Sequence, residues 1–165
     1  MIVLFAAPFA LQGLAIFVDE FYFHRARGLP QWEKIGHPLD TLTVGLCFGY
    51  LLAMPFSRGA SLGFVALSVF SCVFVTKDEW VHKKECSANE LWLHSLLFVL
   101  HPIVLILAGF IWYLRSNPSV AALSGWDNSL MSLAWLAVQT QAAIVAVFFV
   151  YQLVYWNFIW KRVRQ

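Results

Sequence analysis

The chain has 165 residues, of which 61% are hydrophobic and only 12% charged, whereas soluble domains are about half apolar and a quarter charged. The formal net charge of +2 is too small, and the basic tracts are too short, to favour nucleic acid as a partner. Several apolar runs of about 17 or more residues are long enough to cross a bilayer as helices. The sequence therefore predicts an all-α, polytopic integral membrane protein, organised as one helical bundle domain over residues 1–165.

The first three helices are predicted from apolar runs separated by short polar segments. The run over residues 2–24 lacks the basic start and the cleavage site of a signal peptide, so we expect a retained helix. A second helix is predicted over 38–56, because Pro38 suits the first turn of a helix. A third helix is predicted over 61–84, where the helix continues beyond the hydrocarbon into a polar stretch.

Two longer helices complete the predicted bundle. Ser87 and Glu90 form the S-x-x-E pattern of a capping box, which predicts the start of a fourth helix over 88–114. Pro102 lies inside this helix and predicts a kink, because proline removes one backbone hydrogen bond. The fifth helix, over 130–160, is longer than a bilayer requires, so we expect it to tilt or to protrude.

The five predicted crossings alternate in direction. One membrane face therefore receives the ends of the first, third and fifth helices and the starts of the second and fourth. Nine of the eleven Lys and Arg residues lie on this face, and only Arg58 and Arg115 lie opposite. An excess of Lys and Arg in short loops marks the cytoplasmic side. We therefore predict an external N-terminus and an internal C-terminus, in a membrane such as the bacterial inner membrane.

The same face receives all five histidines and eight of the nine carboxylates, which the rule for positive charges does not explain. Four carboxylate–imidazole pairs stand three or four residues apart, one pair on each of four helices: Glu20 and His24, His37 and Asp40, Glu79 and His82, and Glu90 and His94. At these separations two side chains share one helical face. We expect the eight side chains to hold two divalent metal ions.

Mixed imidazole and carboxylate ligands suit iron, manganese or zinc, and we favour iron. The combination of carboxylate and imidazole ligands from several helices is similar to that of ferritin-like di-iron bundles, although only Glu79 and His82 have the E-x-x-H spacing of those proteins. The H-x-x-x-H and H-x-x-H-H boxes of membrane desaturases are absent from the sequence. Cys86 lies near the polar cluster and remains an alternative ligand.

Each candidate ligand also has a structural interpretation. Glu90 suits a capping box, Asp40 suits a first helical turn, and His24 and His37 suit contact with lipid headgroups. Three further acids, which are Asp19, Asp78 and Glu85, are better interpreted as salt-bridge partners of neighbouring basic residues. His82 and His94 are harder to explain in this way, because each is paired with an acid on a different helix.

His101 is the one histidine predicted to lie deeper in the membrane. It follows His94 by seven residues, so it points from the same helical face about 10 Å further along the helix. An ionisable side chain at that depth is costly unless it faces the bundle interior. We expect His101 to act in catalysis, as a proton relay or as a hydrogen-bond partner of the substrate, rather than as a metal ligand.

These features predict a metal-dependent membrane oxidoreductase with a non-haem di-iron site that acts on a lipid-like or other apolar substrate. The expected partners are membrane lipids, that small molecule, and a redox partner or a larger membrane assembly. A zinc-dependent membrane hydrolase is the main alternative. A metal transporter or chaperone, a haem protein and a non-catalytic structural subunit are further alternatives.

Overall fold

The computed structural model describes residues 2–160, with side chains from residue 5 onward, and this part of the chain forms helices without any strand. In chain order the elements are α1 (Ile2–Val18), η1 (Asp19–His24), α2 (Arg25–Arg27), α3 (Gln31–Ala53), α4 (Arg58–Phe74), η2 (Val75–Asp78), α5 (Glu79–Glu85), α6 (Ala88–Ser116), α7 (Pro118–Leu123), α8 (Asn128–Val154) and η3 (Tyr155–Ile159). The predicted all-helical fold is therefore confirmed. Within the described residues, three helical segments are long and apolar enough to cross a membrane: Arg58–Glu85, Ala88–Ser116 and Asn128–Ile159.

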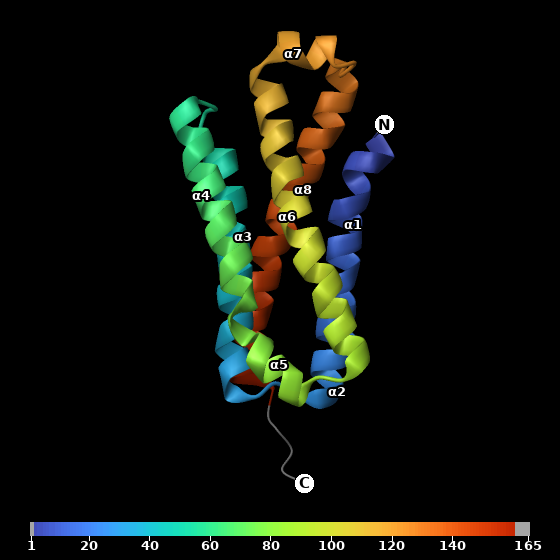
Figure 1. The fold of residues 1–165 in the computed structure, drawn as a ribbon, viewed down its shortest axis with the longest axis vertical. Coiled ribbons are helices and arrows are strands. Elements are labelled where there is room, and N and C mark those ends of the chain that lie inside the picture. Colours follow the sequence, from blue (N-terminus) through green and yellow to red (C-terminus); the bar gives the residue numbers. More distant parts are fainter. Residues whose placement is uncertain (1, 161–165) are drawn as a thin grey trace.

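The long helices run side by side along the longest axis of the molecule (Figure 1). Short segments gather at the two ends, with α2 and α5 at the lower end in this view and α7 at the upper end. We call the lower end the polar end; it consists of η1, α2, η2, α5 and the first two turns of α3 and α6. It holds most of the charged side chains of the chain, so the bundle has one charged end and an apolar remainder.

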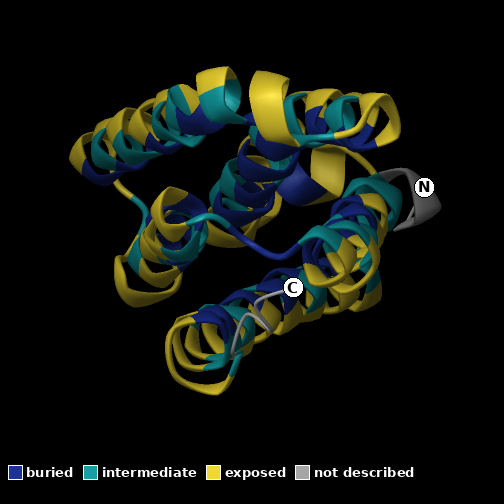
Figure 2. Cartoon of the chain, turned by 90° about the horizontal axis from the view of Figure 1, so that it is seen from below, coloured by how far each residue is buried: buried dark blue, intermediate teal, exposed yellow. Residues whose placement is uncertain are grey.

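The apolar core fills the half of the bundle away from the polar end, where α3, α4, α6 and α8 meet around Phe48, Val104 and Ile111. The outward faces are also apolar, and Leu62, Val69, Ile106 and Val147 are among many exposed side chains. Seen from below, the exposed residues lie on the outer sides of the helices and the buried ones face the interior (Figure 2). A bundle that exposes apolar side chains all around is suited to a hydrocarbon solvent rather than water.

Side-chain caps define three of the helix starts. The Ser57 hydroxyl accepts a hydrogen bond from the backbone N–H of Ala60 at 3.1 Å, which caps α4. Ser87 caps α6 in the same way, through the N–H of Glu90 at 3.3 Å, as the capping-box pattern predicts. The carboxylate of Asp127 caps α8. These caps satisfy backbone donors that the first turn of a helix leaves free.

The second long helix differs from the sequence-based expectation, because α3 begins at Gln31 and carries Pro38 in its interior. Proline has no N–H, so the carbonyl of Lys34 loses its helical donor. The side chain of Asn157 donates to that carbonyl instead, at 3.5 Å. The earlier start places Glu33 four residues before His37 on one helical face.

The first long helix changes its winding where it reaches the polar end. Residues Asp19–His24 form a π-helical turn between α1 and α2. In a π-helix, residues five apart are hydrogen-bonded neighbours, so Asp19 and His24 share a face that ideal α-helical spacing would not give them. In α6, Pro102 lies midway between the ends, and the helix changes direction near its middle (Figure 1), in agreement with the predicted kink.

Candidate metal centre

Four imidazole rings meet at the polar end, each from a different element. The ring centroids of His24 and His37 are 4.5 Å apart, and those of His82 and His94 are 4.4 Å apart. The ring centroids of His37 and His82 are 6.0 Å apart and those of His24 and His94 are 6.3 Å apart, so each ring has two neighbours among the four. The helical ends of η1, α3, α5 and α6 therefore converge on a single cluster of four histidines.

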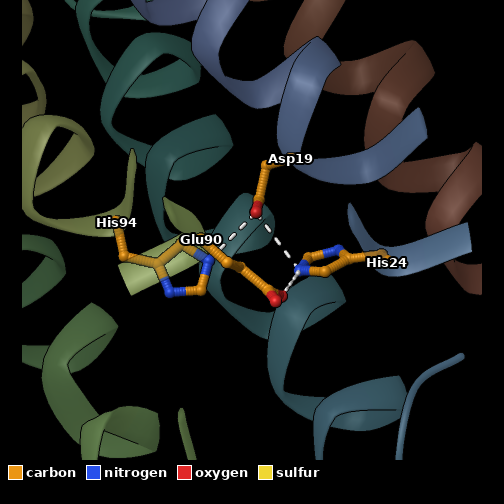
Figure 3. Close-up of side chains that lie close together, drawn as sticks. All are labelled: Asp19, His24, Glu90 and His94. Carbon is orange, nitrogen blue, oxygen red and sulfur yellow. Dashed lines mark hydrogen bonds and ion pairs between the residues drawn. The ribbon is translucent and has the colours of Figure 1, made fainter. Parts of the chain in front are cut away.

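Asp19, His24, Glu90 and His94 form one half of this cluster, which we call the first half-site (Figure 3). The two carboxylate oxygens of Asp19 face two imidazoles, with Oδ2 at 3.3 Å from His24 Nε2 and Oδ1 at 3.0 Å from His94 Nε2. Glu90 Oε1 lies 3.8 Å from the same His24 nitrogen. All four residues are buried.

Glu33, His37 and His82 form the second half-site, with Glu79 beside it on the opposite ring nitrogen of His82. It resembles the first half-site in having one carboxylate between two imidazoles. Glu33 is fully buried, with Oε2 at 3.8 Å from His37 Nε2 and Oε1 at 3.8 Å from His82 Nε2. Glu79 Oε1 lies 3.3 Å from His82 Nδ1, and its side chain is 44% exposed. Each half-site thus has one carboxylate between two imidazoles and a second carboxylate beside them.

Several of these atoms are buried without a hydrogen-bond partner in the described residues. The unpartnered atoms of the cluster are His24 Nε2, Glu33 Oε1, His37 Nε2, His82 Nε2 and His94 Nδ1. Buried polar atoms are normally hydrogen-bonded, so these atoms need an explanation. The Nε2 atoms of His24, His37 and His82 face the carboxylates of the half-sites, whereas His94 contacts Asp19 through Nε2 and its unpartnered nitrogen is the opposite one. Ligands at about 2.1 Å from one ion lie about 3.0–3.4 Å apart, so separations of 3.0–3.8 Å require only small shifts to enclose one.

Arg27 connects the two half-sites. Its guanidinium donates to Glu33 Oε2 at 2.8 Å and to Glu90 Oε1 at 2.9 and 3.2 Å. Burial raises the pKa of Glu33, but His37 and the charge of Arg27 outweigh it and lower the pKa to about 2. Glu33 is therefore an ionised carboxylate at neutral pH, which is the form that binds metal ions.

Glu20 contacts His24 of the first half-site on the ring nitrogen that points away from that site. Its Oε2 lies 3.4 Å from His24 Nδ1, while its Oε1 accepts a hydrogen bond from Trp156 at 2.6 Å. The Gln152 amide donates to Glu20 as well, at 3.4 Å. A carboxylate on the far nitrogen of an imidazole fixes the orientation of the ring, so that Nε2 of His24 is presented to the first half-site.

Asp40 is not brought into either half-site. It accepts a hydrogen bond from Lys77 at 2.6 Å, and Lys77 also donates to Asp78 at 2.8 Å. This contact requires a close approach of α3 and η2 at Gly36, where a Cβ atom would lie 2.6 Å from an Asp78 oxygen. Asp78 additionally accepts a hydrogen bond from the indole of Trp32. Both Asp78 and Asp40 are therefore salt-bridge partners of Lys77.

A cavity of about 250 Å³ runs from the histidine cluster toward the middle of the bundle and includes His101 among its lining residues. Both ring nitrogens of His101 are engaged: Nε2 lies 3.1 Å from the Ser71 hydroxyl, and Nδ1 lies 3.4 Å from the Gln12 amide nitrogen. The walls between are mainly apolar, with Ile16 and Phe98 among them. His101 thus faces the same interior as the half-sites without belonging to either.

Six of the eight residues predicted as ligands come together in or beside the half-sites: His24, His37, Glu79, His82, Glu90 and His94. The structure adds Asp19 and Glu33, which occupy the positions expected for Glu20 and Asp40. The pair Glu33 and His37, four residues apart, is visible in the sequence once the helix is started at Gln31 rather than at Pro38. Burial raises the pKa of the Cys86 thiol, and a protonated thiol is a poor metal ligand.

No protein-family model matches the chain, and no similar curated protein or solved structure was found. Similar sites occur on unrelated folds, and one fold supports many functions. The chemistry of the clustered side chains therefore carries the functional conclusion, together with the apolar surface that surrounds them.

Proposed function

We propose that this chain is a membrane-embedded oxidoreductase whose polar end holds two metal ions, iron in preference to manganese or zinc, one in each half-site. The observation that carries the proposal is the repetition of the half-sites, in which Asp19 and Glu33 each stand between two imidazoles. A structural polar cluster has no need of two matching carboxylate–diimidazole units with unpartnered nitrogens.

The charges in the cluster support two divalent ions rather than one. Five carboxylates line or support the half-sites: Asp19, Glu20, Glu33, Glu79 and Glu90. Among residues 2–160, Arg27 supplies the single guanidinium that contacts them. Two divalent cations balance the four remaining negative charges, and uncompensated charges in a buried site are expensive.

The proposed reaction is the oxidation of an apolar molecule, with a redox partner as the electron acceptor. Iron ions held by mixed imidazole and carboxylate ligands supply electron-transfer chemistry that carboxylates and imidazoles lack. The side chains of the cavity supply the other requirements, because Ile16, Phe98 and Phe148 form an apolar wall that excludes water and accepts hydrocarbon. In this proposal α1, α3, α4, α6 and α8 all cross the membrane, and the polar end faces the cytoplasm.

The direct test is the metal content of detergent-purified protein, measured by mass spectrometry together with an absorption spectrum. Two iron ions per chain without a Soret band support the proposal. Zinc would instead support a membrane hydrolase, for which half-exposed Glu79, 3.3 Å from His82, is suited to act as general base. A Soret band would indicate haem, and a chain free of any metal would refute a metal-dependent function.

A further inference from the structure

The inner end of the cavity is lined by neutral polar side chains rather than by charged ones. Gln12 of α1, His101 of α6 and Gln141 of α8 all line it, and each is at most 6% exposed. We call these three residues the inner polar group. It lies about two helical turns, or about 10 Å, from the first half-site, because His101 follows His94 by seven residues on α6.

A chain of hydrogen bonds determines which atom of His101 carries the proton. The Thr43 hydroxyl donates to the backbone carbonyl of Asp40 at 2.8 Å, so its oxygen must accept from Ser71, which is also 2.8 Å away. The hydroxyl proton of Ser71 is then engaged in its hydrogen bond to Thr43. His101 Nε2, at 3.1 Å from the Ser71 oxygen, must therefore be the donor in that contact.

The same chain then orients the amide of Gln12. No carboxylate contacts the His101 ring within the described residues, so the buried imidazole is neutral and its Nδ1 is an acceptor. Gln12 must turn its amide nitrogen toward that Nδ1, at 3.4 Å, which leaves its Oε1 as the free atom. This oxygen is buried without a partner in the described residues. Gln141 of α8 lines the same cavity and is 6% exposed.

We infer that the inner polar group binds the hydroxyl group of an apolar alcohol, which donates to Gln12 Oε1 and accepts from the Gln141 amide. A hydroxyl does both, whereas a ketone or an ether only accepts. A charged group is disfavoured because the hydrogen bonds of Gln12 and His101 within the described residues involve no charged side chain. A cavity of about 250 Å³ suits one compact molecule rather than a lipid with two acyl chains. The inference rests on the proposed function only in that the other end of this molecule reaches the half-sites.

The test compares two probes that differ in one donor, decan-1-ol and decyl methyl ether. Purified protein in lipid nanodiscs is titrated with each probe, and affinity is obtained from the saturable shift in unfolding temperature. We expect the alcohol to bind the wild-type protein about tenfold more tightly than the ether, the range that one buried hydrogen bond supplies. Equal affinity for the two probes would overturn the inference.

Variants assign the preference to the named atoms. Gln12→Leu should reduce the preference for the alcohol to near unity, and His101→Leu should weaken it because the Gln12 amide loses its anchor. Gln139→Leu, at an exposed position of α8, is the matched control and should retain the full preference. Metal content is measured on every sample. A preserved preference in Gln12→Leu refutes the subsite. Wild-type protein that purifies without metal refutes the proposed function, and a normal preference for the alcohol in that protein leaves the subsite in place.

Discussion

Replacing Arg27 by Met removes the cation that joins the two half-sites, and its effect should depend on whether metal is bound. The Arg27 side chain is 17% exposed, whereas those of Glu33 and Glu90 are 0% and 3% exposed. Removing one partner of such a buried ion pair costs about 3–5 kcal/mol, because the other charges are left uncompensated. For a chain of this length that corresponds to a decrease of about 10 °C in unfolding temperature.

The same substitution should be far less damaging in the metal-loaded protein. Two divalent ions in the half-sites would compensate the charges of Glu33 and Glu90, so the decrease should fall to less than half of that in the metal-free form. The assay is thermal unfolding in detergent, followed by tryptophan fluorescence, with and without a chelator. Arg115→Met is the control, because Arg115 is exposed and lies over the Trp135 ring at 4.5 Å. An equal decrease with and without metal would refute the charge balance.

Four further predictions follow from the same geometry. Glu33→Gln should lose metal and Asp40→Asn should retain it, as measured by metal per chain, because only Glu33 lies between two imidazoles. His82→Ala and His94→Ala should each lose metal while inserting normally; Asp127→Ala should keep metal and lose about 1 kcal/mol of stability with its helix cap. Lowering the pH from 7.5 to 5.5 should release metal on dialysis, because imidazoles must be neutral to bind a metal ion. Glu33 does not contribute to this release, since its pKa is lowered from 4.5 to about 2. Its stabilising effect is present above pH 4.5 and is lost only as the pH falls toward 2. A reporter fused to the C-terminus should be active only in the cytoplasm, and external activity would contradict the orientation.

The convergence of four histidines was predictable because two simple signals agree. Apolar runs set the depth of each helix end, and spacings of three or four residues set which side chains share a face. For His82 with Glu79 these signals were sufficient, since α5 is regular over that stretch. They also placed Glu90 correctly, although its carboxylate contacts Arg27 rather than closing a capping box.

The remaining members of the half-sites depend on features that spacing alone does not reveal. Asp19 shares a face with His24 only because the helix widens into a π-helical turn, which has no simple sequence signal. Glu33 was hidden by the assumption that Pro38 starts a helix, whereas Asn157 compensates the missing hydrogen bond and allows the proline inside. Asp40 pairs with Lys77, which lies 37 residues away in the sequence, and such long-range pairs follow from packing rather than from local pattern.

The distribution of charge along the cavity also restricts the reaction that the proposed site would perform. Among the residues that line the cavity, the acids Asp19, Glu20 and Asp40 lie near the histidine cluster. The inner polar group is built from neutral amides and an imidazole, as low dielectric requires. An alcohol held by Gln12 would therefore place its hydroxyl about 10 Å from the half-sites, since His94 and His101 are two turns apart. The hydroxyl-bearing carbon would be out of reach of the metal ions. Oxidation would then occur at the far end of the molecule, and the product of a long-chain alcohol would carry its new functional group distant from the original hydroxyl.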